Sequence, residues 1–256
     1  MTRFSANLGF LWADRPLPEA IRRAKSAGFD AVECHWPYDQ PTEPVRAALV
    51  ETGLAMIGLN TRRGHAGENG LSGLPGREAD AQAAIDEAIT YAEAIDAGAI
   101  HVMAGFAEGA AATRTFVKNL CYAAGATDRM ILIEPLNQYD APGYFLKTTD
   151  QARAIIDEVA VSNLKLMFDC YHVGRTEGDV ASRIAALMTY IGHIQFASVP
   201  DRGPPDHGDV DYQALFAEIA RLGWEQPLGA EYKVSGPTDQ HLAWLDLFKG
   251  QAVRDA

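Results

Sequence analysis

The sequence alternates short apolar segments with longer amphipathic ones from one end to the other, and this alternation restricts the possible fold more than any other feature. The apolar segments are nearly continuous, as is typical of strands buried on both faces of a parallel sheet. Eight segments are predicted to be strands: Phe4–Leu11, Phe29–His35, Leu54–Asn60, Ala99–Phe106, Met130–Asn137, Leu164–Tyr171, Ile191–Val199 and Pro227–Lys233.

Helical patterns lie between these strands. Pro18–Ala27, for example, has a proline near its start and is followed by Gly28, which is the usual asymmetry of helix ends. The other predicted helices are Pro44–Thr52, Glu78–Ala97, Thr113–Ala124 with Gly125 ending or interrupting it, Asp150–Val159, Val180–Met188, Tyr212–Leu222 and Asp239–Phe248. Eight strand–helix units in a chain of this length predict an α/β fold, a (β/α)8 TIM barrel. No Pro- or Ser-rich linker divides the chain, so residues 1–256 are expected to form one domain.

The charge balance disfavours some classes of partner. The 256 residues include 22 Lys and Arg against 34 Asp and Glu, a net charge of −12, whereas nucleic-acid binding depends on cationic side chains. No stretch approaches the roughly 20 apolar residues of a membrane helix. The three cysteines form no CxxC pair, which indicates reduced thiols. We therefore expect a cytoplasmic protein without a nucleic-acid or membrane partner.

The longest predicted loop, residues 61–77, follows the third strand and contains five glycines. Long loops in compact domains are usually functional or disordered. A loop that follows a barrel strand lies on the active-site face, so this segment is a candidate lid.

Polar residues stand near the carboxyl ends of four predicted strands, where barrel side chains converge. They are Glu134, Asp169 with His172, Gln195 with His193, and Glu231 with Lys233. A single carboxylate at a strand end is more simply a hydrogen-bonded structural group. Three converging carboxylates and an amide oxygen, however, favour a bound cation, because buried unpaired charges are costly. Oxygen ligands of this kind suit Mg2+ or Mn2+.

These segments resemble the hydroxypyruvate isomerase family, which belongs to the xylose-isomerase-like barrel superfamily. The resemblance is carried by IEPLNQYDAPGYFL, DCYHVGRTEGD, IGHIQFASVPDRGPPDHGDVDY and GAEYK, together with RFSANLGFLW, WPYD and LPGRE, and it runs from Arg3 to at least Lys233. It implies four metal ligands: Glu134, Asp169, Gln195 and Glu231. It also implies that Glu134 and Glu231 are the catalytic carboxylates.

The substrate-binding residues follow from the same comparison. The resemblance implies that His172 and Arg202 contact substrate oxygens, and Asn60 and Lys233 are further candidates. We expect His101 and His193 to be barrel-core residues and His35 to lie near the mouth. The loop TRRGHAGENG departs from the family's composition, which leaves the identity of the substrate open.

The function that the resemblance implies is a metal-dependent isomerisation of a small 2-oxo acid. Hydroxypyruvate would become tartronate semialdehyde through an ene-diolate, a reaction that needs a base on each side and a cation. The substrate carboxylate needs a counter-cation, for which Arg62, Arg63, Arg202 and Lys233 are candidates. A 2-oxo-tetronate isomerase and a ketose 3-epimerase remain alternatives.

Two other classes of function fit this sequence less well than isomerisation. A DNA-repair nuclease of the endonuclease IV type needs more histidines for three zinc ions, and a non-catalytic binding barrel has no need of two bases. Superfamily relatives often form homodimers or homotetramers, so the resemblance makes either assembly possible here.

Overall fold

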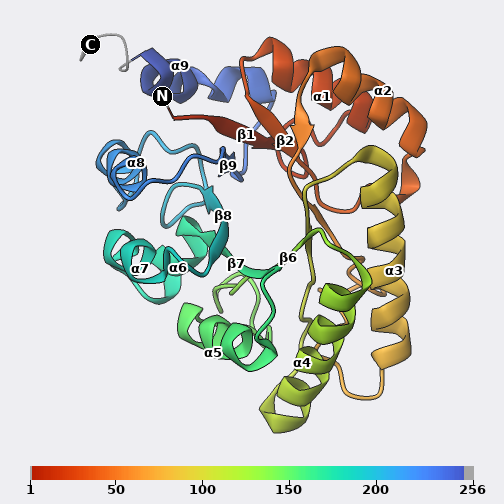
Figure 1. The fold of residues 1–256 in the computed structure, drawn as a ribbon. Coiled ribbons are helices and arrows are strands. Elements are labelled where there is room, and N and C mark those ends of the chain that lie inside the picture. Colours follow the sequence, from red (N-terminus) through yellow and green to blue (C-terminus); the bar gives the residue numbers. More distant parts are fainter. Residues whose placement is uncertain (1, 251–256) are drawn as a thin grey trace.

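The computed structural model describes residues 2–250, so positions 1 and 251–256 of the predicted domain lie outside it. Within that range, parallel strands form a ring at the centre of the molecule and helices surround it (Figure 1). The strands are β1 (Phe4–Asn7), β2 (Ala31–Glu33), β3 (Ala55–Met56), β4 (Leu59–Asn60), β5 (Ala99–His101), β6 (Met130–Ile133), β7 (Leu164–Asp169), β8 (Ile191–Phe196) and β9 (Leu228–Ala230). The predicted (β/α)8 barrel is confirmed.

The barrel closes through the third predicted strand, Leu54–Asn60, which the structure divides into β3 and β4. β3 pairs with β2 and β4 pairs with β5, so this one segment joins the two ends of the sheet order β3-β2-β1-β9-β8-β7-β6-β5-β4. Between the two short strands, the amide of Ile57 donates to Val32 O (2.8 Å) and Gly58 O accepts from the amide of Cys34 (3.1 Å). The ring of backbone pairing therefore has no open edge at this point.

The helices agree with the predicted ones to within a few residues. They are α1 (Leu17–Ser26), α2 (Thr42–Thr52), α3 (Glu78–Ile95), α4 (Gly109–Ala126), α5 (Thr149–Val159), α6 (Cys170–Thr176), α7 (Val180–Leu187), α8 (Tyr212–Arg221) and α9 (Ala243–Gly250), with 3-10 turns at Pro37–Asp39 and Thr238–His241. Gly125 neither ends nor interrupts α4, which continues to Ala126. No helix in the described part of the chain is long and apolar enough to cross a membrane.

The predicted strand ends were wrong in one respect that matters for the pocket. The sixth strand was expected to reach Tyr171, but β7 ends at Asp169 and the short helix α6 begins at Cys170. The Asp169 carboxylate caps this helix by accepting a hydrogen bond from the Tyr171 amide (2.7 Å). The turn from strand to helix places His172 over the end of the barrel rather than along the strand.

Register in the parallel sheet determines which side chains meet at the mouth. Asp169 lies level with Gln195, and Gln195 lies level with Gly229 of β9. Asn7 and Glu33 are level in the same way at the ends of β1 and β2. The row of Asp169, Gln195 and Gly229 continues to Ser5 of β1 and Ala31 of β2, so Asn7 and Glu33 lie two residues further along their strands.

The loop of residues 61–77 is attached to the barrel along its second half. Gly70 forms a β-bridge with Ala104, and the amide of Ser72 donates to Met103 O (3.2 Å). Gly70 has φ +109°, and a Cβ there would lie 2.5 Å from Met103 O, so only glycine fits. These contacts restrict any lid movement to the exposed first half of the loop.

Candidate active site

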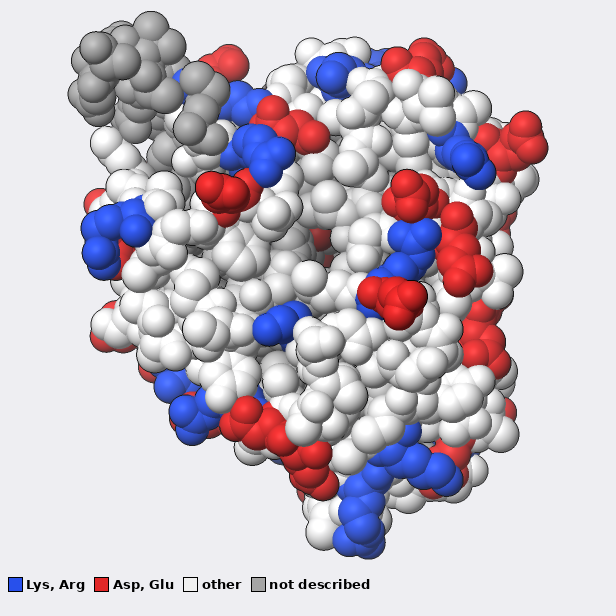
Figure 2. All heavy atoms as spheres, viewed as in Figure 1, with Lys and Arg blue, Asp and Glu red and all other residues white. Residues whose placement is uncertain are grey.

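The predicted strand-end residues meet in one pocket at the carboxyl ends of the strands. Glu134 and Glu231 directly follow β6 and β9, Asp169 ends β7 and Gln195 lies in β8; all four are buried, at 1–6% exposed. The pocket has a volume of about 320 Å³. It is lined by seven residues that the sequence proposed as catalytic or substrate-binding: Asn60, Arg63, Glu134, His172, Arg202, Glu231 and Lys233. Figure 2 shows the pocket as a hollow near the centre of this face, with acidic atoms inside it.

Four side chains in this pocket could hold a metal ion together. One ligand atom from each of Glu134, Asp169, His172 and Glu231 lies within 4.8 Å of the other three. Three buried oxygens nearby have no hydrogen-bond partner: Glu134 Oε1, Asp169 Oδ2 and Gln195 Oε1. Unpartnered buried acceptors are rare, and those of Glu134 and Asp169, which belong to the same close group, fit a bound cation. The residues present therefore suit a hard divalent ion.

His172 and Gln195 differ in what they can offer such an ion. The Nδ1 atom of His172 accepts hydrogen bonds from the backbone amide of Asn137 (3.1 Å) and from its Nδ2 (2.7 Å). The Asn137 amide orientation is fixed, because its Oδ1 accepts from the backbone amides of Tyr139 (3.1 Å) and Asp140 (2.9 Å). The imidazole proton must then be on Nε2, which becomes a donor rather than a ligand. Gln195 Oε1, in contrast, is a free acceptor.

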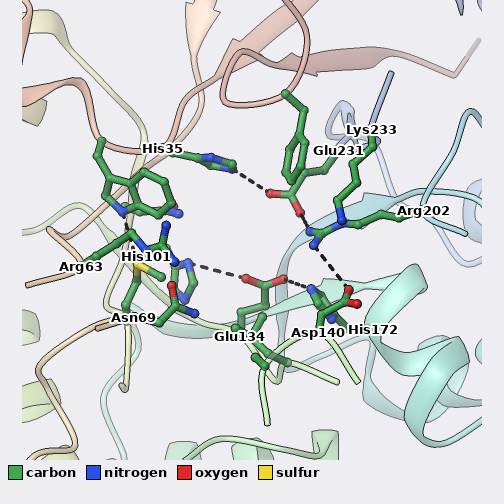
Figure 3. Close-up of a pocket in the computed structure, with 16 residues that line it drawn as sticks. His35, Arg63, Asn69, His101, Glu134, Asp140, His172, Arg202, Glu231 and Lys233 are labelled. Carbon is green, nitrogen blue, oxygen red and sulfur yellow. Dashed lines mark hydrogen bonds and ion pairs between the residues drawn. The ribbon is translucent and has the colours of Figure 1, made fainter. Parts of the chain in front are cut away.

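Glu231 is stabilised in its ionised form. Its Oε1 accepts from Asn7 Nδ2 (2.9 Å) and lies 3.1 Å from His35 Nε2, and its Oε2 accepts from the Arg202 guanidinium (Figure 3). Burial alone would raise the pKa of Glu231, but the Arg202 charge and the His35 hydrogen bond lower that pKa to about 2. His35 also lines the pocket, at the mouth of the barrel as expected.

Glu134 is in the opposite condition. Burial, followed by the charges of Glu231 and Asp169, raises the pKa of Glu134 well above its ordinary value. Burial and the Glu231 charge likewise raise the pKa of Asp169 to about 7. Glu134 and Glu231 thus face one pocket with very different proton affinities, which is the arrangement that general acid–base catalysis uses.

Two histidines flank Glu134 without a close hydrogen bond to it. His101 Nδ1 lies 3.7 Å from Glu134 Oε2, and His172 Nε2 lies 3.7 Å from Glu134 Oε1 (Figure 3). Burial lowers the pKa of His101 to about 4 and that of His172 to about 3, so both rings are neutral near pH 7. His101, for which a core position was favoured over a place in the site, has both: it is 2% exposed in β5, and it also lines the pocket.

Sequence reasoning missed a second polar group, which lies beneath the pocket. Glu33 Oε2 lies 2.7 Å from His193 Nε2 and accepts a hydrogen bond from Gln195 Nε2 (3.4 Å). Gly229 leaves the space for this group, because a Cβ there would lie 2.4 Å from Glu33 Oε1 and 2.9 Å from Gln195 Cγ. The signal was available: Glu33 ends an apolar run just as Glu134 does.

Of the four cationic side chains proposed to bind the substrate carboxylate, three line the pocket and one does not. Arg62 faces away from the pocket and is bound by both oxygens of Glu87 (2.6 and 3.0 Å), so the interpretation of Arg62 as a substrate cation was wrong. Arg63, Arg202 and Lys233 line the pocket.

Comparison with known proteins agrees with this geometry. Residues 21–248 match the model of the xylose isomerase-like TIM barrel family. The chain is 41% identical to a 2-oxo-tetronate isomerase of Cupriavidus necator over 98% of this chain and 100% of the relative. It is 35% identical to the hydroxypyruvate isomerase of Escherichia coli K12 over 97% of this chain and 100% of the relative. A crystal structure described as an AP endonuclease of family 2 from Brucella melitensis superposes with a TM-score of 0.93 at 34% identity, covering 97% and 99% of the two chains.

The fold and the site define a xylose-isomerase-like TIM barrel enzyme. Within that class, the chain belongs to the hydroxypyruvate isomerase family, as the sequence resemblance implied, and it is an isomerase.

Proposed function

We propose that this protein is a metal-dependent isomerase of a small 2-oxo acid with a hydroxyl group on the neighbouring carbon. The observation that carries the proposal is the pair Glu134 and Glu231, whose carboxylate oxygens lie within 4.8 Å of one another across the pocket. A bound divalent cation supplies charge stabilisation to the two oxygens of an ene-diolate. The unpartnered oxygens of Glu134, Asp169 and Gln195 support this use of the site.

The chain's own residues account for the proton movements. Hydroxypyruvate becomes tartronate semialdehyde when one proton leaves C3 and one returns to C2. Of Glu134 and Glu231, one takes the first proton and the other returns the second, and Arg202 orients the Glu231 carboxylate. The Nε2–H group of His172 points toward the acidic group and can donate a hydrogen bond to a substrate oxygen.

Hydroxypyruvate is our first choice of substrate, and a four-carbon 2-oxo-tetronate is the second. The second is supported by the 41% identity to a 2-oxo-tetronate isomerase. A panel of hydroxypyruvate, 2-oxo-tetronates and neutral ketoses with Mg2+ or Mn2+ distinguishes them. If the enzyme converts none of the 2-oxo acids, the proposal is refuted.

The base assignment is tested by proton exchange. The metal-loaded enzyme is incubated with hydroxypyruvate in D2O, and deuterium at the substrate carbon is followed by NMR. Glu134→Gln and Glu231→Gln should each abolish exchange, whereas the exposed surface variant Glu158→Gln should exchange at the wild-type rate. Full exchange in either pocket variant removes that residue from the base role.

A DNA-repair nuclease is not favoured by the site, although one similar crystal structure carries an endonuclease name. The described residues hold one group of metal-capable side chains, in which His172 is the single histidine. On the face of Figure 2, Lys and Arg are interspersed with Asp and Glu around the hollow. Metal analysis separates the functions, since one Mg2+ or Mn2+ per chain is expected here and three zinc ions in the nuclease.

A further inference from the structure

A 2-oxo acid must bring its own carboxylate into a pocket that already holds three. The chain has a net charge of −12, so long-range attraction does not assist an anion. A local cation that is not already neutralised is therefore needed. Three cationic side chains line the pocket: Arg63, Arg202 and Lys233.

Arg202 is occupied by acidic partners. Its guanidinium donates to Glu231 Oε2 and lies 3.8 Å from Asp140 Oδ2 and 3.9 Å from Asp169 Oδ2. Its Cζ lies 4.8 Å from the centre of the Phe10 ring. Because three carboxylates share one guanidinium, Arg202 holds the acidic group together and has little charge left for a substrate.

Lys233 lies on the same side of the pocket as Arg202 and Glu231 (Figure 3). Its backbone amide donates to Arg202 O (2.7 Å), which ties the two segments together. In the described part of the chain Lys233, like Arg63, has no carboxylate within 4 Å, but a substrate carboxylate placed beside it would lie next to Glu231.

Arg63 stands on the other side, away from the acids (Figure 3). Its Cζ lies 4.8 Å from the centre of the Trp36 ring, so the guanidinium is held by a cation–π contact. Among residues 2–250, no carboxylate lies within 4 Å of it. Asn69 and Met103, which are uncharged, line this wall of the pocket.

The backbone holds Arg63 in place. Its carbonyl oxygen accepts from the Gly70 amide (2.8 Å), and Gly70 is itself bridged to Ala104 beside β5. The Trp36 indole, which contacts this guanidinium, is itself held in place because its Nε1–H donates a hydrogen bond to Met103 Sδ (3.3 Å). The side chain of Arg63 is exposed, so the backbone hydrogen bond and the contact with Trp36 are what restrict its freedom.

We propose that Arg63 binds the substrate carboxylate and makes the pocket selective for 2-oxo acids over neutral ketoses. This inference rests on the proposed function. Arginine suits the role because its planar guanidinium matches a carboxylate in a bidentate contact. The carboxylate then lies at the Trp36 wall, and the keto and hydroxyl oxygens lie toward Glu134 and Glu231.

The test compares an acid with a neutral analogue of the same length. Hydroxypyruvate is measured as substrate, and dihydroxyacetone, in which the carboxylate is replaced by a hydroxymethyl group, as competitor. For Arg63→Gln we expect KM for hydroxypyruvate to rise roughly 30- to 100-fold with kcat within about 3-fold, as for loss of a hydrogen-bonded charge. The inhibition constant of dihydroxyacetone should stay within about 3-fold, and Arg63→Lys should recover part of the loss.

Arg62→Gln is the matched control, since the neighbouring guanidinium binds Glu87 outside the pocket, and it should change neither constant. The inference is overturned if Arg63→Gln raises the KM for hydroxypyruvate and the inhibition constant of dihydroxyacetone by the same factor. It is also overturned if the KM for hydroxypyruvate does not change. A selective loss of the acid in Lys233→Gln that Arg63→Gln does not share overturns it too. If wild-type enzyme converts no 2-oxo acid, the proposed function fails before any variant is made, and this inference fails with it.

Discussion

His172 and Asn137 are joined by two hydrogen bonds to the same ring nitrogen, since both the backbone amide and the side-chain amide of Asn137 donate to His172 Nδ1. This contact leaves the ring proton on Nε2, which faces Glu134 and Asp169 at 3.7 Å. A nitrogen that carries a proton has no lone pair for a metal. The pocket therefore contains a built-in donor beside its oxygen ligands.

The first prediction distinguishes Gln195 as a metal ligand from His172 as a hydrogen-bond donor. Gln195→Ala should weaken Mn2+ binding to the metal-free protein at least about 10-fold, because it removes an oxygen ligand. His172→Ala should change that affinity less than about 3-fold and lower kcat about 100-fold, as for a lost donor to developing charge. Isothermal titration with Mn2+ measures the first quantity and steady-state kinetics the second. The reverse pattern of affinities would make His172 the ligand.

The second prediction concerns the support beneath the pocket. Gln195 Nε2 donates to Glu33 Oε2 (3.4 Å) and to Glu231 Oε1 (3.3 Å), which fixes the orientation of the amide and leaves Oε1 without a partner. Glu33→Gln keeps the volume but allows the Gln195 amide to reverse. We expect Mn2+ affinity to fall about 10- to 100-fold, the usual effect of losing a partner of a metal ligand.

The exposed variant Glu158→Gln is the control for the loss of a carboxylate elsewhere, and circular dichroism should show both variants folded. Mn2+ affinity of Glu33→Gln equal to that of wild type would mean that the barrel wall alone orients Gln195.

Much of the fold could be predicted from the sequence because the signals are local. Apolar runs and helix ends gave the eight strand–helix units, and three of the four predicted ligands have an unpartnered oxygen at the mouth. The strand ends were less predictable. Apolar residues such as Val102 continue past the end of β5 into a buried loop, so composition does not mark where backbone pairing stops.

The missed parts of the site depend on contacts between distant segments. Asn7 donates to Glu231 and Glu33 contacts His193, across 224 and 160 positions of the chain. Only the register of the sheet brings these pairs together. The orientation of Arg62 and Arg63 was equally hidden, because adjacent arginines of one loop face Glu87 and Trp36 respectively.

The third prediction uses two glycines with different surroundings. Gly229→Ala would place a Cβ 2.4 Å from Glu33 Oε1 and 2.9 Å from His193 Nε2, so the group beneath the pocket must move. We expect the free energy of unfolding to fall by about 1–3 kcal/mol, as for other overpacked sites. Gly125→Ala in α4 meets no atom within 4 Å and should raise it by about 0.5 kcal/mol. Urea unfolding measures both, and equal stability of the two variants would contradict the close packing at Gly229.

The fourth prediction concerns pH and removal of metal. In the metal-free protein, burial and the Glu231 charge raise the pKa of Asp169 to about 7, and burial raises that of Glu134 too. A carboxyl whose pKa is raised by folding stabilises the fold in its protonated form. That contribution is complete below about pH 4 and is lost as the pH rises through 7. Glu231 acts in the opposite sense, but its pKa of about 2 places its window below pH 4.5.

Below about pH 6.5 the effect of the two raised carboxyls is opposed by His101 and His172, because burial lowers their pKa values to about 4 and 3, and folding therefore disfavours their protonation. Between pH 6.5 and 8 Asp169 and Glu134 should dominate, and the metal-free protein should lose about 3 °C in Tm over this range. The Asp169→Asn variant should show a flatter profile, because its amide does not titrate. Added Mn2+ should reverse the trend, since a cation binds the ionised carboxylates and its affinity increases with pH. Thermal unfolding in EDTA and in Mn2+ at each pH provides the measurement. A metal-free Tm that rises from pH 6.5 to 8 and is equally steep in Asp169→Asn would show that these two carboxyls do not control the stability of the pocket.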